Sequence, residues 1–289
     1  KRICIMKYSV LNGNNIDVLK TISDNTLDGC ITDPPYGMGM EEWDYAVPTV
    51  ELWQEVYRVL KPGAFCLSFC SPELYHRMAV NLEDGGFEIK DMVNWIITTK
   101  MAKRNRLKPA HEPIAVAQKP FKGSIKNNVE KWGTGEIIIK GNKIPWEGKP
   151  PTGWVKDGHL RRTFGKDGNT TGNAKDNGTV DADPSGRYPS NVIGLFDNDD
   201  HQKYFYAPRV SRKEKGEDND HPTCKPIDLM SFLVNVYVPT GGHVLDPFNG
   251  SGSTGIATVK SGRDYTGIEL SKHYCELSEA RISEYTKLV

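Results

Sequence analysis

The sequence predicts an α/β fold: a doubly wound, mainly parallel sheet with helices on both faces, interrupted by a long insertion. Strand and helix patterns alternate over residues 1–118 and again over 221–289, which is typical of a parallel sheet covered on both sides. The stretch between them, residues 119–220, is rich in Gly, Lys, Asn and Pro. With 289 residues, 37% of them hydrophobic, the chain has enough material for one large domain that carries an insertion.

In the first part, apolar runs that end in Gly or Pro predict strands, and apolar side chains at helical spacing predict helices. The predicted strands lie at 8–13, 27–32, 64–69, 87–97 and 113–117. The predicted helices have their apolar faces at Ile16, Leu19 and Ile22, at Val50, Trp53, Tyr57 and Leu60, and at Leu74, Met78 and Leu82. We expect Pro62 and Gly63 to end the second of these helices before the strand at 64 begins.

The last part continues the alternation. The expected elements are a helix through Leu229, Phe232, Leu233 and Val236, a strand at 243–246, a glycine loop, a helix to about Ser261, a strand at 265–269 and a last helix over 277–288. Only two of these strands flank the glycine loop, so residues 1–118 have to supply the rest of the sheet. The sequence therefore predicts one circularly permuted domain, with halves at 1–118 and 221–289. Residues 119–220, with one strand-like run at 190–196, are inserted between the halves.

The glycine loop predicts a nucleotide site. Gly250, Gly252 and Gly255 form G-x-G-x-x-G after a strand, as in loops that bind a nucleotide at a helix N-terminus. Glu269 ends the next strand, at a spacing where an acidic side chain accepts hydrogen bonds from ribose hydroxyls. Asp246, ahead of the loop, would repel a pyrophosphate but suits a positive group. S-adenosylmethionine, a nucleoside with a sulfonium and an ammonium, therefore fits better than NAD; a nicotinamide oxidoreductase is the alternative that depends on the glycine pattern alone.

Residues 32–37, TDPPYG, predict the second half of a site. Pro34 and Pro35 remove two N–H donors, so the loop presents carbonyl oxygens, the Asp33 carboxylate and the Tyr36 ring. Such a set of acceptors beside an aromatic ring suits a planar amine on a heteroaromatic base. Asp33 and the Pro34 carbonyl would each accept one amino hydrogen, and Tyr36 would stack on the base.

These motifs resemble those of the beta-class DNA amino-methyltransferases, which transfer a methyl group from S-adenosylmethionine to the exocyclic amine of adenine or cytosine. DPPYG at 33–37 resembles their catalytic motif, DPFNGSGSTG at 246–255 their cofactor loop and GIELS at 267–271 their ribose-binding strand. HPTCKP at 221–226 matches the segment that the family places ahead of the cofactor loop. The order of the motifs, catalytic before cofactor, is that of the beta class. GRYPSNVI at 186–193 also resembles phage-type members.

The resemblance implies a Rossmann-like methyltransferase sheet and a set of site residues. The catalytic residues would be Asp33, Pro34, Pro35 and Tyr36. The cofactor-binding residues would be Asp246, Pro247, Phe248, Gly250, Ser251, Gly252, Glu269, Leu270, Thr223, Lys225 and Asn14. Among these, Thr223 and Lys225 would approach the methionine carboxylate, and Asn14, where the class often has Asp, would accept from the adenine amine of the cofactor. Cytosine-specific members more often have Ser in place of Asp33, so adenine is the predicted target and cytosine the alternative.

The net charge of the chain is zero, but the charge is unevenly distributed. Residues 100–166 contain 16 Lys and Arg against 5 Asp and Glu, whereas 167–220 contain 7 against 11. A basic stretch interleaved with aromatic residues predicts contact with DNA phosphates, and a solvated loop region is the alternative. The predicted DNA-binding residues are Lys103, Arg104, Arg106, Lys108, Arg161 and Arg162. We expect the inserted region to carry target recognition, and the target base to flip out of the duplex into the site.

The predicted partner is double-stranded DNA, and the sequence leaves open a homodimer and a cognate restriction endonuclease. No apolar run is long enough for a membrane span, so we expect a protein of the cytoplasm, in a prokaryotic or phage-infected cell. The six cysteines are scattered without C-x-x-C pairs, so no metal site is expected. Related enzymes with Asn in place of Asp33 act on protein glutamine or RNA bases, and a non-catalytic DNA-binding protein is a further alternative. The Asp33 carboxylate and the long basic insertion argue against the first, and the intact DPPYG motif and glycine loop argue against the second.

Overall fold

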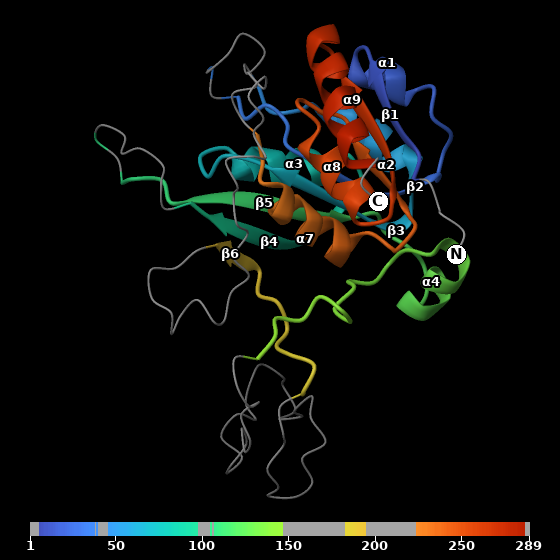
Figure 1. Cartoon of the computed structure of the whole chain (residues 1–289), viewed down its shortest axis with the longest axis vertical. Coiled ribbons are helices and arrows are strands. Elements are labelled where there is room, and N and C mark those ends of the chain that lie inside the picture. The colour runs from blue at the N-terminus through green and yellow to red at the C-terminus, as the bar shows by residue number, and fades with distance from the viewer. Residues whose placement is uncertain are drawn as a thin grey trace, which may run out of the picture.

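One sheet runs through the molecule and joins the two halves of the chain (Figure 1). The computed structural model describes residues 6–37, 39, 46–97, 105, 107–146, 183–194 and 224–286. Within them the strands are β1 (Tyr8–Asn12), β2 (Leu27–Thr32), β3 (Leu60–Phe69), β4 (Glu88–Ile96), β5 (His111–Gln118), β6 (Val192–Gly194), β7 (His243–Asp246) and β8 (Asp264–Glu269). Their order in the sheet is β1-β8-β7-β2-β3-β5-β4-β6. The predicted α/β class with a mainly parallel sheet is therefore confirmed.

Strands from opposite ends of the sequence are neighbours in this sheet. β1 pairs with β8, with Asn12 opposite Glu269, and β2 pairs with β7, with Cys30 opposite Leu245. β1, β8, β7, β2 and β3 all run parallel, so their carboxyl ends meet at one edge of the sheet. The first half of the chain thus completes the sheet of the last half, as the motif order predicts.

β5 runs antiparallel to both of its neighbours, β3 and β4. Phe69, the last residue of β3, lies opposite Ile114 of β5. The residues that precede Ile114 therefore extend past the end of β3, and His111 and Glu112 lie at the edge where the parallel strands end. The direction of β5 thus brings its first residues to the edge that carries the DPPYG motif and the glycine loop.

Helices cover both faces of the sheet. α1 (Asn15–Leu19), α2 (Val50–Val59) and α3 (Tyr75–Asp84) share a core with one face, and α7 (Ile227–Tyr237), α8 (Ser253–Lys260) and α9 (Lys272–Thr286) with the other. Successive strand residues point to opposite faces, so Cys30 belongs to the first core and Ile31 to the second. Figure 1 shows β1, in blue, beside α9, in red, and these two elements are in contact.

The helices begin and end where local chemistry favours it. The Thr49 hydroxyl accepts a hydrogen bond from the Leu52 N–H and caps α2, whose buried face includes Leu52 and Val56. α4 (Ile125–Trp132) begins after the capping residue Ser124 and ends at Gly133, which has a φ of 79°. α4 lies beside β3, in the region where the sequence indicated few periodic segments.

β3 begins earlier than the sequence indicated. We expected Pro62 and Gly63 to end the preceding helix, but the helix ends before them and both residues lie inside the strand. The pairing of β3 with β2 is irregular there and jumps from Leu60 to Phe65. The strand can therefore include Pro62 and Gly63 without pairing them to β2. Ile22 was expected on a helix and lies beyond the end of α1.

None of the helices within the described residues is long and apolar enough to cross a membrane. In the same residues, no cluster of three or more His, Cys, Asp or Glu side chains could hold a metal ion.

Candidate active site

Three acidic residues gather at the carboxyl edge of the sheet. Asp33 directly follows β2, Asp246 ends β7 and Glu269 ends β8. The strands β8, β7 and β2 are consecutive in the sheet, so residues far apart in the sequence become neighbours. Open parallel sheets bind ligands at this edge, and both halves of the predicted site lie there.

Glu269 holds the glycine loop in place. Its Oε2 atom accepts a hydrogen bond of 2.8 Å from the Gly250 N–H, and its Oε1 atom accepts one of 2.8 Å from the Ser271 N–H. The side chain is only partly buried, and each carboxylate oxygen has a second lone pair. Glu269 can therefore hold the loop and still accept hydrogen bonds from a pair of hydroxyl groups.

Gly252 turns the chain into α8. Its φ is +81°, and a Cβ atom there would lie 2.8 Å from the Cβ atom of Ser278, so a side chain would be both strained and obstructed. No side chain caps the N-terminus of α8, and the buried Ser253 hydroxyl has no hydrogen-bond partner within the described part of the chain. The first turn of α8 thus offers N–H and hydroxyl groups to an anionic or polar ligand.

Asp246 is almost fully buried, with 1% of its surface exposed. Its Oδ1 atom accepts hydrogen bonds from the Thr32 hydroxyl, at 2.6 Å, and from the Phe248 N–H, at 3.0 Å. Burial raises the pKa of Asp246 to about 6, although hydrogen bonds from Thr254, Thr32 and the Phe248 N–H act in the opposite direction. A cationic group next to Asp246 would lower this pKa again, so the site favours a positively charged ligand. Thr32 opens the TDPPYG stretch, but the sequence did not predict that its hydroxyl would hold Asp246.

Asp33 belongs to a buried group of charged side chains. Its Oδ1 atom accepts a hydrogen bond of 2.7 Å from the Tyr36 hydroxyl, and its Oδ2 atom accepts one from the Lys225 ammonium. The same ammonium nitrogen lies 3.6 Å from the Glu112 Oε2 atom and 3.3 Å from the Tyr36 hydroxyl oxygen. Only 8% of the Lys225 side chain is exposed, against 19% for Asp33 and 11% for Glu112. Two carboxylates thus share one buried ammonium.

The carboxylates of Asp33 and Glu112 shift the pKa values of Lys225 and Tyr36. Burial lowers the pKa of Lys225, but the charges of Asp33 and Glu112 outweigh burial, so this pKa is raised above its usual value. Burial raises the pKa of the Tyr36 hydroxyl, and Asp33 and Glu112 raise it further. Lys225 is therefore an ammonium and Tyr36 a neutral phenol at neutral pH.

The sequence did not indicate Glu112, nor the contact between Lys225 and Asp33. Lys225 was predicted near a methionine carboxylate, whereas the structure places its ammonium on Asp33. Glu112 comes from β5, a strand whose direction the sequence did not predict. The available signal was a polar pair, His111 and Glu112, directly ahead of the apolar run at 113–117.

The other predicted cofactor residues differ in their surroundings. Ser251 is buried within the glycine loop, whereas Leu270 is 71% exposed. Pro247 and Phe248 lead from Asp246 into that loop. Asn14 lies after β1, where its Oδ1 atom accepts hydrogen bonds from two N–H groups of α1 and caps that helix. Thr223 lies outside the described residues.

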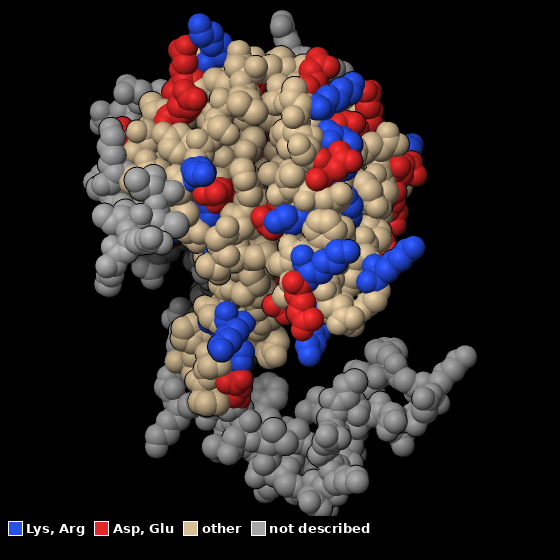
Figure 2. Space-filling model, turned by 90° about the vertical axis from the view of Figure 1, so that its right-hand side faces the viewer, with Lys and Arg blue, Asp and Glu red and all other residues tan. Residues whose placement is uncertain are grey.

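Most of the predicted DNA-binding residues lie outside the described part of the chain. These are Lys103, Arg104, Arg106, Arg161 and Arg162. Lys108 is exposed on the segment that leads into β5, and so lies toward the edge that carries Glu112. On the face seen in Figure 2, basic and acidic side chains of the described residues are mixed.

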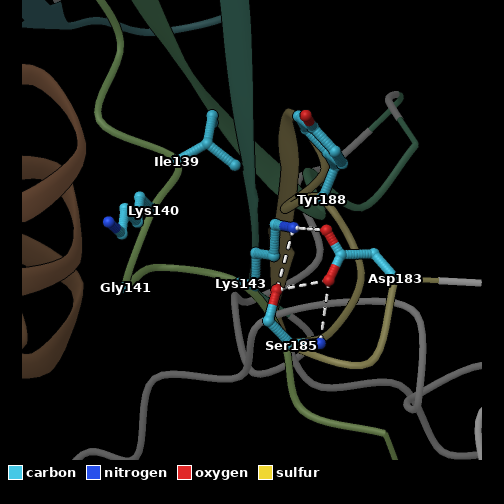
Figure 3. A pocket seen from close by; sticks show the side chains of 7 residues that line it. All are labelled: Ile139, Lys140, Gly141, Lys143, Asp183, Ser185 and Tyr188. Carbon is cyan, nitrogen blue, oxygen red and sulfur yellow. Dashed lines mark hydrogen bonds and ion pairs between the residues drawn. The ribbon is translucent and has the colours of Figure 1, made fainter.

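A separate hollow of about 500 Å³ lies between residues 139–143 and 183–188 (Figure 3). The Lys143 ammonium forms an ion pair with Asp183 there and donates a hydrogen bond of 2.9 Å to the Ser185 hydroxyl. The Lys143 ammonium lowers the pKa of Asp183, and the Ser185 hydroxyl and N–H lower it further. None of the residues that line this hollow comes from the carboxyl ends of β2, β7 or β8, so it is distinct from the group around Asp33.

Comparison with known proteins identifies the family. The family model N6_N4_Mtase, described as DNA methylase, matches residues 27–280. The Type II methyltransferase M.HindIII of Haemophilus influenzae is 23% identical, over 90% of each chain. The Type II methyltransferase M.HpaI of Haemophilus parainfluenzae is 24% identical, over 96% of this chain and 74% of its own.

Solved structures agree on the fold. The complex of M1.HpyAVI with S-adenosylmethionine superposes with a TM-score of 0.55 and 19% identity, over 95% of this chain and 99% of its own. The PvuII DNA methyltransferase, which is cytosine-N4-specific, gives a TM-score of 0.61 and 13% identity, over 97% of this chain and 92% of its own. At these identities the superpositions show the fold, while the match of the family model shows the membership. The chain belongs to the N6_N4_Mtase family of DNA methylases, which use S-adenosylmethionine as methyl donor.

Proposed function

We propose that the chain transfers a methyl group from S-adenosylmethionine to the exocyclic amino group of adenine in double-stranded DNA. The observation that carries this proposal is the position of Asp33. It follows β2 and lies beside β7, whose terminal Asp246 borders the glycine loop. One edge of the sheet therefore presents a site for a cationic nucleoside next to a carboxylate that can accept hydrogens from an amine.

The cofactor residues suit the parts of S-adenosylmethionine. When bound, this cofactor supplies a methyl group attached to a positively charged sulfur. Asp246 would accept from its ammonium group, since a cation relieves the cost of a buried carboxylate. Glu269 would accept from the ribose hydroxyls, and the N–H groups at the start of α8, which no side chain of the described residues caps, would donate to the methionine carboxylate.

The target amine would be held by Asp33 and the Pro34 carbonyl, each of which accepts one amino hydrogen. Tyr36 would stack on the flipped base. The amine nitrogen forms its new bond to the methyl carbon as the bond between that carbon and sulfur breaks, and the sulfur leaves as a neutral thioether. The methylated amine then loses a proton to Asp33 or to water. Most of the rate enhancement would come from placement and hydrogen bonding.

Asp33 also favours adenine over cytosine, because cytosine-specific members of the family more often have Ser at this position. Cytosine is the second candidate, since the PvuII enzyme, which shares the fold, is cytosine-N4-specific. Both a hydroxyl and a carboxylate can accept an amino hydrogen, so the assignment depends on the resemblance rather than on the chemistry of the transfer.

The DNA would lie over the edge that carries Asp33. Lys108 and the basic residues predicted in 100–166 would contact its phosphates, and the 119–220 region would recognise the target. Because the relatives reported above are bacterial Type II methyltransferases by name, we place the chain in a bacterial or phage-infected cytoplasm, with a cognate endonuclease as a candidate partner.

Expression in a host that lacks DNA methylation, followed by sequencing with modified-base detection, tests the proposal. We expect N6-methyladenine at a defined site. Cells that express the Asp33→Ala chain are the matched control, and they should show no modification. N4-methylcytosine instead would contradict the adenine assignment, and unmodified DNA would contradict the transfer to DNA.

A further inference from the structure

Three buried polar side chains join the glycine loop to β8 and α9, and the proposed transfer gives none of them a role. They are Asn249, Tyr265 and Ser278, each at most 4% exposed. We propose that Asn249 is a positioning residue for S-adenosylmethionine. Its side-chain amide sets the peptide group between Gly250 and Ser251 so that the Ser251 N–H faces the cofactor. The inference rests on the methyl donor of the family and does not depend on which base the chain methylates.

The neighbours of Asn249 leave its amide one orientation. Its Nδ2 atom donates hydrogen bonds of 2.9 Å to the Gly250 carbonyl and to the Ser278 hydroxyl. Ser278 uses its own hydrogen on the Cys275 carbonyl, so its oxygen accepts from Asn249. The Asn249 Oδ1 atom therefore faces the Tyr265 hydroxyl, which donates to it at 2.8 Å. A rotation of the amide by half a turn would bring Oδ1 against the Gly250 carbonyl, where two acceptors would meet without a hydrogen between them.

This orientation fixes the peptide group between Gly250 and Ser251. Glu269 accepts from the Gly250 N–H, while Asn249 donates to the Gly250 carbonyl. The peptide bond is trans, so its C=O and N–H groups point in opposite directions. The Ser251 N–H thus points away from the Asn249 amide, and it donates to no acceptor among the described residues.

Two buried donors in front of α8 therefore await a partner. Ser251 is 4% exposed and Ser253 is 8% exposed, and the Ser253 hydroxyl also has no hydrogen-bond partner in the part of the chain that the structure describes. Buried N–H and hydroxyl groups are costly to leave unpaired. Both groups lie where the methionine carboxylate of the cofactor would accept from the start of α8.

Two glycines make room for the network. A Cβ atom at Gly255 would lie 2.7 Å from the Tyr265 Cε1 atom, and one at Gly267 would lie 2.5 Å from the Asn249 Oδ1 atom. Packing this close restricts the turning of the amide and of the ring. The loop therefore has its binding geometry before the cofactor arrives, and a site that is ordered in advance binds more tightly, because less conformational freedom is lost on binding.

Asn249→Ala is the primary test, because it removes the amide and its three hydrogen bonds. We expect the dissociation constant of S-adenosylmethionine, measured by calorimetry without DNA, to rise about 10- to 100-fold. The acceptor end is unchanged, so kcat at saturating cofactor should stay close to that of the wild type. In the cofactor-free chain, amide hydrogen exchange over residues 247–256 should become faster, since the loop is no longer held.

Asn128→Ala is the matched control. Asn128 is also a buried asparagine whose Nδ2 atom donates to two backbone carbonyls, those of Pro62 and Thr134, but it lies on α4. Both alanine variants should unfold at a lower urea concentration than the wild type. Only Asn249→Ala should lose affinity for the cofactor, which separates a positioning role from a purely structural one.

Tyr265→Phe is the milder test, and it decides the question if the Asn249→Ala chain does not fold. It removes the hydroxyl that donates to Asn249 but keeps the ring, so affinity for S-adenosylmethionine should fall about 3- to 10-fold. Tyr237→Phe is its control and should bind like the wild type. Tyr237 is a buried tyrosine of the same core cluster, and its hydroxyl forms no hydrogen bond with the described residues.

Wild-type affinity in a folded Asn249→Ala chain would overturn the inference, as would wild-type affinity in Tyr265→Phe where the alanine chain does not fold. An equal loss of affinity in Asn128→Ala would do the same, because binding would then follow stability alone. A wild-type chain that binds S-adenosylmethionine but leaves DNA unmodified would contradict the proposed function. The affinities of these variants would still decide the role of Asn249.

Discussion

The two ends of the proposed site, one for the cofactor and one for the target amine, share one edge of one sheet but are built in different ways. The cofactor end lies within the continuous stretch 246–271 and consists largely of backbone: N–H groups, a left-handed glycine and a carboxylate that holds the loop. The acceptor end is made of charged side chains from the loop after β2, from β5 and from the segment before α7. A local motif is therefore enough to encode the cofactor end, whereas the acceptor end depends on the topology of the sheet.

The largest effect is expected at the centre of the acceptor end. Asp33→Ala removes the acceptor for the amine hydrogen and leaves Lys225 with Glu112, so methyl transfer should fall about 1,000-fold or more. The cofactor end is built from other residues, and binding of S-adenosylmethionine should persist. The rate of methyl transfer is measured with a radiolabelled methyl group on DNA, and the binding of S-adenosylmethionine is measured by calorimetry. Turnover close to that of the wild type would refute the catalytic assignment, and loss of both properties would mean that the two ends do not act separately.

At the cofactor end, Gly252→Ala should act through the backbone. The positive φ of Gly252 is strained for an alanine, and the new Cβ atom would collide with Ser278. We therefore expect the free energy of unfolding to fall by about 2–4 kcal/mol and cofactor binding to weaken strongly. Gly262→Ala is the matched control. Gly262 has a similar φ, +73°, but nothing lies within 4 Å of its added Cβ, so strain alone should cost about 1 kcal/mol. Urea unfolding of both variants makes the comparison, and equal losses would show that the contact with Ser278 does not matter.

Asp246 offers a test in which stability and binding change in opposite directions. Its pKa in the folded state, about 6, lies above that of an unfolded Asp, so its ionisation destabilises the fold. The stability that the neutral form provides is present below about pH 4, is lost as the pH rises to about 6, and does not decline further above that. Asp246→Asn should therefore raise the free energy of unfolding by about 1–3 kcal/mol at pH 7.5, and this gain should shrink between pH 6 and pH 4.

The same variant should bind the cofactor worse. An amide lacks the charge that the methionine ammonium requires, so affinity for S-adenosylmethionine should fall about 10- to 100-fold at pH 7.5. The wild-type affinity should rise as the pH rises through about 6, because the carboxylate form binds the cation. Denaturation and calorimetry at pH 5 and pH 7.5 provide the measurements. An Asp246→Asn chain that binds normally would assign the ammonium to a different acceptor.

The contrast between the two ends also explains what the sequence could predict. The strand before the glycine loop, the loop and Glu269 follow one another along the chain, so their spacing predicts a common site. Asp33 was predicted because the prolines after it restrict the backbone. Glu112 lies 79 residues beyond Asp33 in the sequence, and it reaches Lys225 only through the direction of β5, which depends on long-range pairing that periodicity does not indicate. The early start of β3 at Leu60 was missed for a similar reason: pairing with β2 overrides the local effect of Pro62 and Gly63.

The smallest effect is expected at Asn14, and it tests how far the cofactor end extends. Its Oδ1 atom accepts from the Ile16 N–H at 3.0 Å and the Asp17 N–H at 3.4 Å. Asn14→Asp keeps this cap and replaces the amide NH2 group with a second acceptor. If the side chain also meets the adenine amine of the cofactor, affinity for S-adenosylmethionine should rise about threefold. Asn14→Ser retains a capping hydroxyl but reaches less far, so its affinity should fall below that of the wild type. If calorimetry gives the same affinity for all three chains, the only role of Asn14 is to cap α1. The adenine ring would then be held by residues of β8 and the glycine loop.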